Sequence, residues 1–218
     1  MILNTSFARE LAAHLLDINA VVLRPNDPFV WTSGWNSPIY CDNRLTLRFP
    51  EIRNKIENEF TNIIQEKFPD TDVITGTATA GIPHAAWVAA NLNKPMAYVR
   101  AKAKAHGMGN QIEGGVRKGE STVIIEDLIS TGGSAISVVE ALKFVGANVE
   151  AVLSIFTYGF DKANNRFQDT DVPIYTLTDY NTLVNVAIEK GMIDCDDLDL
   201  LSSWRDHPDV WPDAPEEQ

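Results

Sequence analysis

The residues best suited to chemistry form one uninterrupted run, from Val123 to Ser134. The apolar stretch Val123–Ile125 is followed by two acids, Glu126 and Asp127, and then by hydroxyl and glycine residues that lead into a helical pattern. Such a loop presents unpaired backbone N–H groups at a helix start, and its glycines permit close approach, so it favours phosphate. Two carboxylates beside a phosphate site suit a ligand that also carries hydroxyls. The run therefore predicts a ribose-phosphate site, and the alternative is a plain strand-to-helix turn.

Basic residues gather just before this run. Five of the 18 lysines and arginines, together with His106, fall within nineteen residues that hold a single acid, Glu113. The five are Arg100, Lys102, Lys104, Arg117 and Lys118. The chain as a whole has a net charge of −12, which argues against nucleic-acid and anionic-membrane partners. A basic strip in so acidic a chain predicts a small anionic ligand.

The elements that must position these groups alternate between strand and helix patterns. This alternation, with short connections, predicts an α/β fold with a mainly parallel sheet covered on both faces. The expected strands are 73–75, 96–99, 122–125, 152–157 and 174–177, and the expected helices begin near residue 5 and cover 50–68, 82–92, 133–145 and 182–190. Residues 24–42 are expected to form turns and short irregular strands, in which Trp31 and Trp35 pack. The acidic end of the chain is expected to be a solvated tail anchored by Trp204 and Trp211.

Length and cysteine content set the broad class. A chain of 218 residues is expected to form a single domain. Cys41 and Cys195 are far apart in a sequence without metal-binding or disulfide spacing, which fits a reducing, cytoplasmic compartment. The uncharged stretch 73–93 carries too many polar residues, glycines and prolines to span a bilayer. No membrane partner is expected.

The run from Val123 to Ser134 resembles the phosphoribosyl-pyrophosphate motif of the type I phosphoribosyltransferases. Three more stretches resemble one branch of that family, the orotate phosphoribosyltransferases: 33–44, 98–107 (Tyr98-Val99-Arg100 and Lys104-Ala105-His106-Gly107) and 110–114. The similarity extends from about Phe29 to Val139 and returns at Leu201–Arg205.

The resemblance implies a fold and a reaction. The fold is a central, mainly parallel sheet flanked by helices, with a helix and small hood at about 1–48, the α/β core at about 49–190 and a C-terminal segment at about 191–218. The reaction joins orotate to the ribosyl group of 5-phospho-α-D-ribose 1-diphosphate (phosphoribosyl pyrophosphate). It yields orotidine 5′-monophosphate and pyrophosphate in pyrimidine biosynthesis. Mg²⁺ bound mainly through pyrophosphate is the implied cofactor, with no certain protein ligand.

The resemblance also assigns residues. Glu126 and Asp127 match the acids on the ribose hydroxyls, and Arg100, Lys104 and His106 match the catalytic, pyrophosphate-gripping groups. The 5′-phosphate loop matches Leu128, Ile129, Ser130, Thr131, Gly132, Gly133 and Ser134, and a second pyrophosphate loop, with a non-proline cis peptide, matches Thr77, Ala78 and Thr79. A lid from about Ala103 to Arg117 closes over the neighbouring subunit's site, so a homodimer is implied.

Orotate itself is expected to meet Ser130. One branch of the family has a lysine where Thr32 stands, a second lysine where Ala101 stands, and an arginine near residues 157–159. This sequence departs at all three positions, and Arg44 or backbone N–H groups are expected to hold the orotate carboxylate instead.

Two other functions stay open. One is phosphoribosyl transfer to a different nucleobase, against which the hood residues argue. The other is a non-catalytic regulator that senses phosphoribosyl pyrophosphate, against which the charge and the Lys104–His106 loop argue.

Overall fold

A six-stranded sheet forms the centre of the computed structural model, which describes residues 1–31, 34–101 and 111–212. The strand order is β10-β9-β8-β5-β6-β7; the first five strands run parallel and β7 is antiparallel to β6. The strands are β5 Val73–Thr77, β6 Met96–Val99, β7 Ile112–Glu113, β8 Ser121–Ile129, β9 Asn148–Thr157 and β10 Ile174–Asp179. The predicted α/β fold with its mainly parallel sheet is confirmed.

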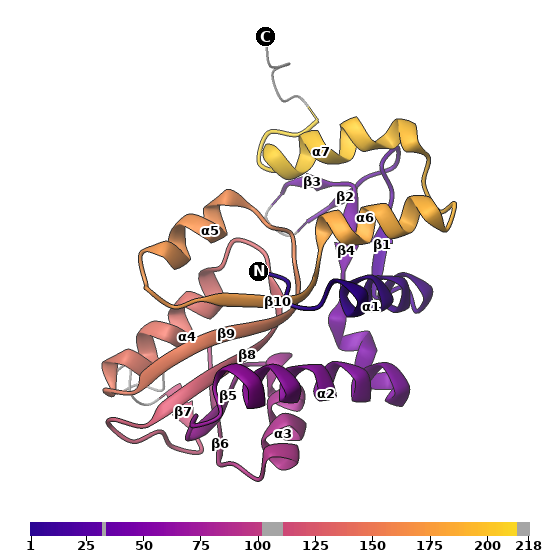
Figure 1. Ribbon diagram of the computed structural model, residues 1–218. Helices are drawn as coiled ribbons and strands as arrows, with labels where there is room; N and C mark the ends of the chain where they lie inside the picture. The colour runs from indigo at the N-terminus through magenta and orange to yellow at the C-terminus, as the bar shows by residue number, and fades with distance from the viewer. Residues whose placement is uncertain (32–33, 102–110, 213–218) are drawn as a thin grey trace.

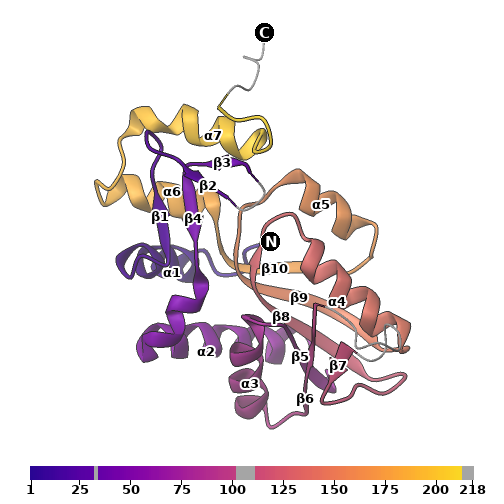
Figure 2. The same cartoon turned by 180° about the vertical axis from the view of Figure 1, so that it is seen from behind.

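Helices cover both faces of the sheet, as Figures 1 and 2 show. Successive strand residues point to opposite faces, so Val123 and Ile125 join one buried cluster while Ile124 joins the other. The first cluster packs against α1 Thr5–Asp17, α2 Pro50–Lys67, α3 Gly81–Leu92 and α6 Tyr180–Glu189, and the second against α4 Gly133–Phe144 and α5 Asp161–Gln168. The continuous apolar strands in the sequence are explained by this double cover.

Local signals explain where several helices begin. The side chain of Asn4 accepts a hydrogen bond from the N–H of Phe7 at 3.1 Å and caps α1, and Pro50 stands in the first turn of α2. The start of α3 lies against β8, because a Cβ added to Gly81 would come within 2.3 Å of the carbonyl oxygen of Ile125. Only glycine fits there, and the close approach brings the loop after β5 next to β8.

The N-terminal part forms the hood, defined here as the short elements between residues 21 and 48. Strand β1 Val21–Leu23 pairs with β4 Ile39–Cys41, β2 Phe29–Val30 pairs with β3 Asn36–Ser37, and a 3₁₀ helix, η1, covers Asn43–Arg48. Helix α7 Leu198–Asp206, which follows a short 3₁₀ turn, η3 Cys195–Asp197, lies beside β2 and β3 in both views (Figures 1 and 2). The irregular strands expected over residues 24–42 are therefore present, as two small antiparallel pairs.

The C-terminal segment is a packed helix over residues 198–206 rather than a solvated tail. Trp204 is fully buried, and its indole N–H donates to the carbonyl of Asn36 in the hood at 3.2 Å. Its ring packs edge-on against Trp31, Tyr158 and Phe160, with ring centroids 5.3–5.7 Å apart. The predicted anchoring by Trp204 and Trp211 is confirmed, since both are buried.

Within the described residues, no helix has the length and apolar character needed to cross a membrane.

Candidate active site

The centre of the site is a cavity of about 400 Å³ at the carboxyl ends of β5 and β8. Its wall consists of residues 77–80, from the last residue of β5 onward, and residues 126–135, which run from β8 into α4. Ligands of open α/β sheets bind beyond the carboxyl ends of the strands. The structure thus brings the acid pair, the loop 128–134 and the Thr77–Thr79 turn together at one place.

The loop reaches α4 through a glycine in a left-handed conformation. Gly132 has φ +79° and precedes the first helical residue, and no side chain caps this helix. A Cβ at Gly132 would also lie 3.2 Å from the ring of Phe167. Because the first N–H groups of a helix have no partner within it, the start of α4 presents donors and the positive end of its dipole to the cavity. This geometry suits an anion such as phosphate.

Glu126 is the buried member of the acid pair, with 4% of its surface exposed. One carboxylate oxygen accepts the N–H of Asp127 at 2.9 Å, whereas the other oxygen and the hydroxyl of Thr77 are buried without a hydrogen bond to any described residue. Burial, reinforced by the neighbouring Asp127, raises the pKa of Glu126 well above its usual value. A buried carboxyl group that lines a cavity and has an oxygen without a hydrogen bond suits a ligand that carries hydroxyl groups.

The acids lie within a strand and not after it. Strand β8 continues to Ile129, since Glu126, Leu128 and Ile129 pair with Ser154, Phe156 and Thr157 of β9. The expectation that the strand ends at Ile125 was wrong because β9 is ten residues long and offers a hydrogen-bonded neighbour that far. The amide of Asn43 donates to the carbonyl of Asp127 at 2.7 Å and ties the hood to the same strand.

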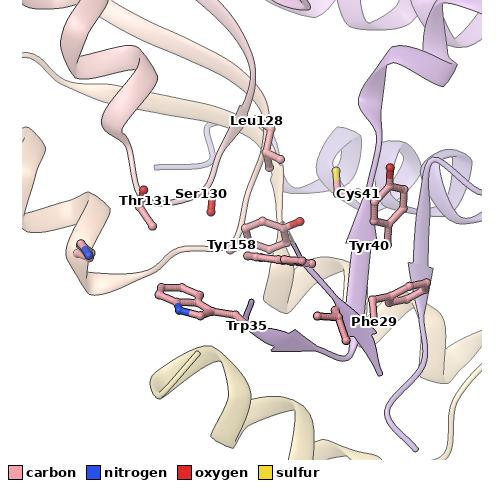
Figure 3. A pocket seen from close by; sticks show the side chains of 11 residues that line it. Phe29, Trp35, Tyr40, Cys41, Leu128, Ser130, Thr131 and Tyr158 are labelled. Carbon is pink, nitrogen blue, oxygen red and sulfur yellow. The ribbon is translucent and has the colours of Figure 1, made fainter. Parts of the chain in front are cut away.

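A second cavity, of about 630 Å³, lies between the hood and the sheet. Its wall is largely aromatic and is shown in Figure 3, where the rings of Phe29, Trp35, Tyr40 and Tyr158 surround the space near Ser130 and Thr131. The remaining lining residues are Val30, Trp31, Cys41, Leu128 and Lys162. Such a wall suits a flat ring. Burial raises the pKa of Cys41 and of Tyr158, so both stay neutral there.

The two cavities share part of their walls. Leu128, Ser130 and Thr131 line both, so the aromatic cavity opens onto the phosphate loop. Trp31 and Trp35 were expected to pack within the hood; Trp31 does pack against Trp204, and both indoles also line the aromatic cavity. In the sequence, this second role was indicated only by the position of the two tryptophans, in or next to the stretch 33–44 that resembles the orotate phosphoribosyltransferases.

Arg100 lines a third cavity, of about 220 Å³, next to the loop. This cavity shares Thr77, Ala78, Gly133 and Ser134 with the central one. Arg100 follows β6, its N–H donates to the carbonyl of Gln111 at 2.9 Å, and its side chain lies 3.4 Å from a carboxylate oxygen of Glu113. The peptide bond between Ala78 and Thr79 is cis, as the resemblance implied.

Other residues named in the sequence analysis are either outside the described part of the chain or do not line these cavities. Lys104, His106 and Thr32 lie outside the described residues. Arg44 binds Asp42 through two nitrogens, at 2.6 and 2.9 Å, and is not among the residues that line the three cavities. The sequence analysis did not identify Lys162, which lines the aromatic cavity. Its only indication in the sequence was a positive charge a few residues after the predicted strand 152–157.

Comparison with known proteins agrees with this geometry. Residues 47–187 match the phosphoribosyl transferase domain family. The orotate phosphoribosyltransferase of Bacillus subtilis is 57% identical over 199 residues, which cover 91% of this chain and 92% of that protein. The crystal structure of orotate phosphoribosyltransferase from Aeropyrum pernix is similar with a TM-score of 0.72 at 27% identity, covering 84% of this chain and 99% of that one. Leishmania donovani UMP synthase has a TM-score of 0.74 at 27% identity over 90% of this chain, which spans 42% of that longer protein. The chain belongs to the orotate phosphoribosyltransferase family.

Proposed function

We propose that the protein transfers the phosphoribosyl group of phosphoribosyl pyrophosphate to orotate, giving orotidine 5′-monophosphate and pyrophosphate for pyrimidine synthesis. The observation that carries this proposal is the junction of the two larger cavities at Leu128, Ser130 and Thr131. A flat base between aromatic rings would there adjoin a ribose phosphate held at the start of α4. Two relatives named orotate phosphoribosyltransferase, 57% and 56% identical to this chain, support orotate as the base.

We assign each part of the two substrates to a group of residues in the cavities. The 5′-phosphate is placed at the loop 128–134, where the uncapped helix start offers N–H donors. Glu126 and Asp127 are placed on the ribose hydroxyls, and the pyrophosphate is placed between the 77–79 turn and Arg100, on the side where the third cavity lies. Ser130, on the shared wall, is placed against orotate.

Residues of the protein are proposed to stabilise the negative charge of the leaving group and to keep water away from the sugar. Breaking the bond from ribose to pyrophosphate forms an oxocarbenium-like sugar, as in glycoside cleavage, while negative charge grows on the leaving group. Arg100, with Lys104 and His106, is proposed to stabilise that charge. The lid from about residue 103 to 117, contributed by the other subunit of a homodimer, is proposed to exclude water, which would otherwise hydrolyse the sugar cation.

The site fits a Mg²⁺ ion that arrives with the substrate. Among the described residues, no group of three or more His, Cys, Asp or Glu side chains could hold a metal. Mg²⁺ commonly keeps several waters and binds through one or two carboxylates plus substrate phosphates. Asp127, which lines the central cavity, could supply a carboxylate of that kind. When bound, Mg²⁺ supplies positive charge that neutralises the pyrophosphate.

The test is a substrate panel. Purified protein with phosphoribosyl pyrophosphate and Mg²⁺ is given orotate, uracil, hypoxanthine, guanine or adenine, and pyrophosphate release is measured alongside orotate absorbance. The expected result is turnover with orotate alone and a large loss of turnover in Lys104→Ala. Turnover with another base would overturn the choice of orotate, and tight binding of phosphoribosyl pyrophosphate without any turnover would indicate a sensor.

A further inference from the structure

The aromatic cavity has one cationic side chain in its described wall, that of Lys162. The other lining residues are neutral, and most are aromatic or aliphatic. Orotate carries a carboxylate on its ring, and a carboxylate that leaves water for such surroundings is strongly disfavoured unless a cation or several donors meet it. A site that takes orotate into this cavity therefore needs a positive group within reach of the ring.

Lys162 is placed to be that group by the helix that carries it. It is the second residue of α5, and Arg166 follows one helical turn later, on the same face. Arg166 donates from Nη1 to the carbonyl of Thr131 at 2.9 Å, which fixes this face of α5 against the loop shared by the two cavities. Lys162 is exposed, and its ammonium has neither a hydrogen bond nor an ion pair with the residues that the structure describes. Its charge is therefore available to a ligand.

Three other cations in the described part of the chain are engaged elsewhere. Arg44 is held by both carboxylate oxygens of Asp42 and lines none of the three cavities. Arg24 lies over the ring of Phe29, 4.8 Å from its centroid, and lines a separate cavity with residues 191–194. Arg100 lies in the third cavity beside Glu113.

We propose that Lys162 binds the carboxylate of orotate and so makes the protein select orotate over a pyrimidine without that group. This inference rests on the proposed function, and it replaces Arg44 in the contact expected from the sequence. Lys162 is then a specificity residue that takes no part in breaking the bond to pyrophosphate. Its removal should weaken binding of the carboxylate-bearing ligands and leave phosphoribosyl pyrophosphate unaffected.

Two nucleotides that differ only in this carboxylate provide the test. Binding of orotidine 5′-monophosphate and of uridine 5′-monophosphate is measured by calorimetry for the wild type, Lys162→Met and Lys162→Arg. Lys190→Met serves as the matched control, since Lys190 pairs with Asp17 at 2.8 Å and lines none of the three cavities of the site. Lys162→Met is expected to bind orotidine 5′-monophosphate on the order of 10- to 100-fold more weakly, while its affinity for uridine 5′-monophosphate stays within about twofold of wild type. Lys162→Arg should retain most of the preference.

Steady-state kinetics give a second readout. Lys162→Met should raise KM for orotate by a similar factor, with KM for phosphoribosyl pyrophosphate unchanged. An unaltered preference for orotidine over uridine monophosphate in Lys162→Met would overturn the inference and leave the proposed function intact. A wild-type protein that does not consume orotate would overturn both.

Discussion

Replacing Trp204 by alanine should both destabilise the protein and damage the aromatic cavity. Trp204 is fully buried at the contact of α7, the hood and the late loop after β9. A buried tryptophan removes about 200 Å² from water, which at about 25 cal/mol per Å² gives an upper limit of about 5 kcal/mol. The carbonyl of Asn36 would also lose its indole donor, at a cost of about 1 kcal/mol. Partial collapse of the space lowers the total, so about 3–5 kcal/mol is expected for the free energy of unfolding.

Urea denaturation followed by circular dichroism, at one fixed protein concentration, measures this loss. Trp204→Phe keeps an aromatic ring and gives up the indole N–H, so it should lose about 1–2 kcal/mol. Trp87→Ala is the matched control, because Trp87 is only half-buried on α3, beside Arg53, and lines none of the three cavities of the site. It should lose clearly less stability than Trp204→Ala.

Kinetics distinguish a general loss of stability from damage to the cavity. Trp31 and Tyr158 line the aromatic cavity, and their rings pack against that of Trp204. Below the unfolding temperature, Trp204→Ala should therefore raise KM for orotate several-fold while KM for phosphoribosyl pyrophosphate changes little. A loss below about 1 kcal/mol, or an equal rise of both KM values, would refute the role given to this contact.

Two further predictions concern the phosphate side of the site. Gly132→Ala should raise KM for phosphoribosyl pyrophosphate at least tenfold and cost about 1–2 kcal/mol of stability, because φ is +79° and the new Cβ would press on Phe167; unchanged kinetics and melting would contradict it. Glu126→Gln should lower turnover yet raise the melting temperature, by more at pH 8 than at pH 5. The raised pKa of Glu126 lets the native state keep a proton that the unfolded chain releases, so wild-type stability falls as pH rises above the usual carboxyl range. A melting-temperature difference that shrinks with increasing pH would show this assignment to be wrong.

Sequence patterns were enough to predict the parts of the fold in which neighbouring residues carry the information. The apolar stretch 122–125 and the helix that starts at Pro50 are present as expected, because burial on both faces and a first-turn proline are local properties. Helix α5 was missed, since only Ala163 and Phe167 are buried among its eight residues and two apolar positions are too few to predict a helix.

The candidate site divides in the same way. The acid pair and the loop up to Ser134 are adjacent in sequence and were predicted together, and in the structure they line one cavity; their roles there stay predictions. The aromatic wall was not predicted, because it assembles residues from the hood, from the end of β8, from the loop after β9 and from α5. Lys162 becomes part of this wall only because the chain after β9 folds back as α5 beside the cavity.

The dependence of the hood on Trp204 also bears on the order in which the protein matures during synthesis. Asn36 and Trp204, which share a hydrogen bond, are separated by 168 residues, so this contact must wait until the chain has been made beyond residue 204. The strands and loop of the phosphate cavity are complete in sequence by residue 135, and a growing chain folds from its N-terminus as it emerges. A ribosome-bound chain that stops before α7 thus contains every described residue of the phosphate cavity but lacks the helix that supports the aromatic wall. The support for base recognition is therefore made later than the phosphate cavity.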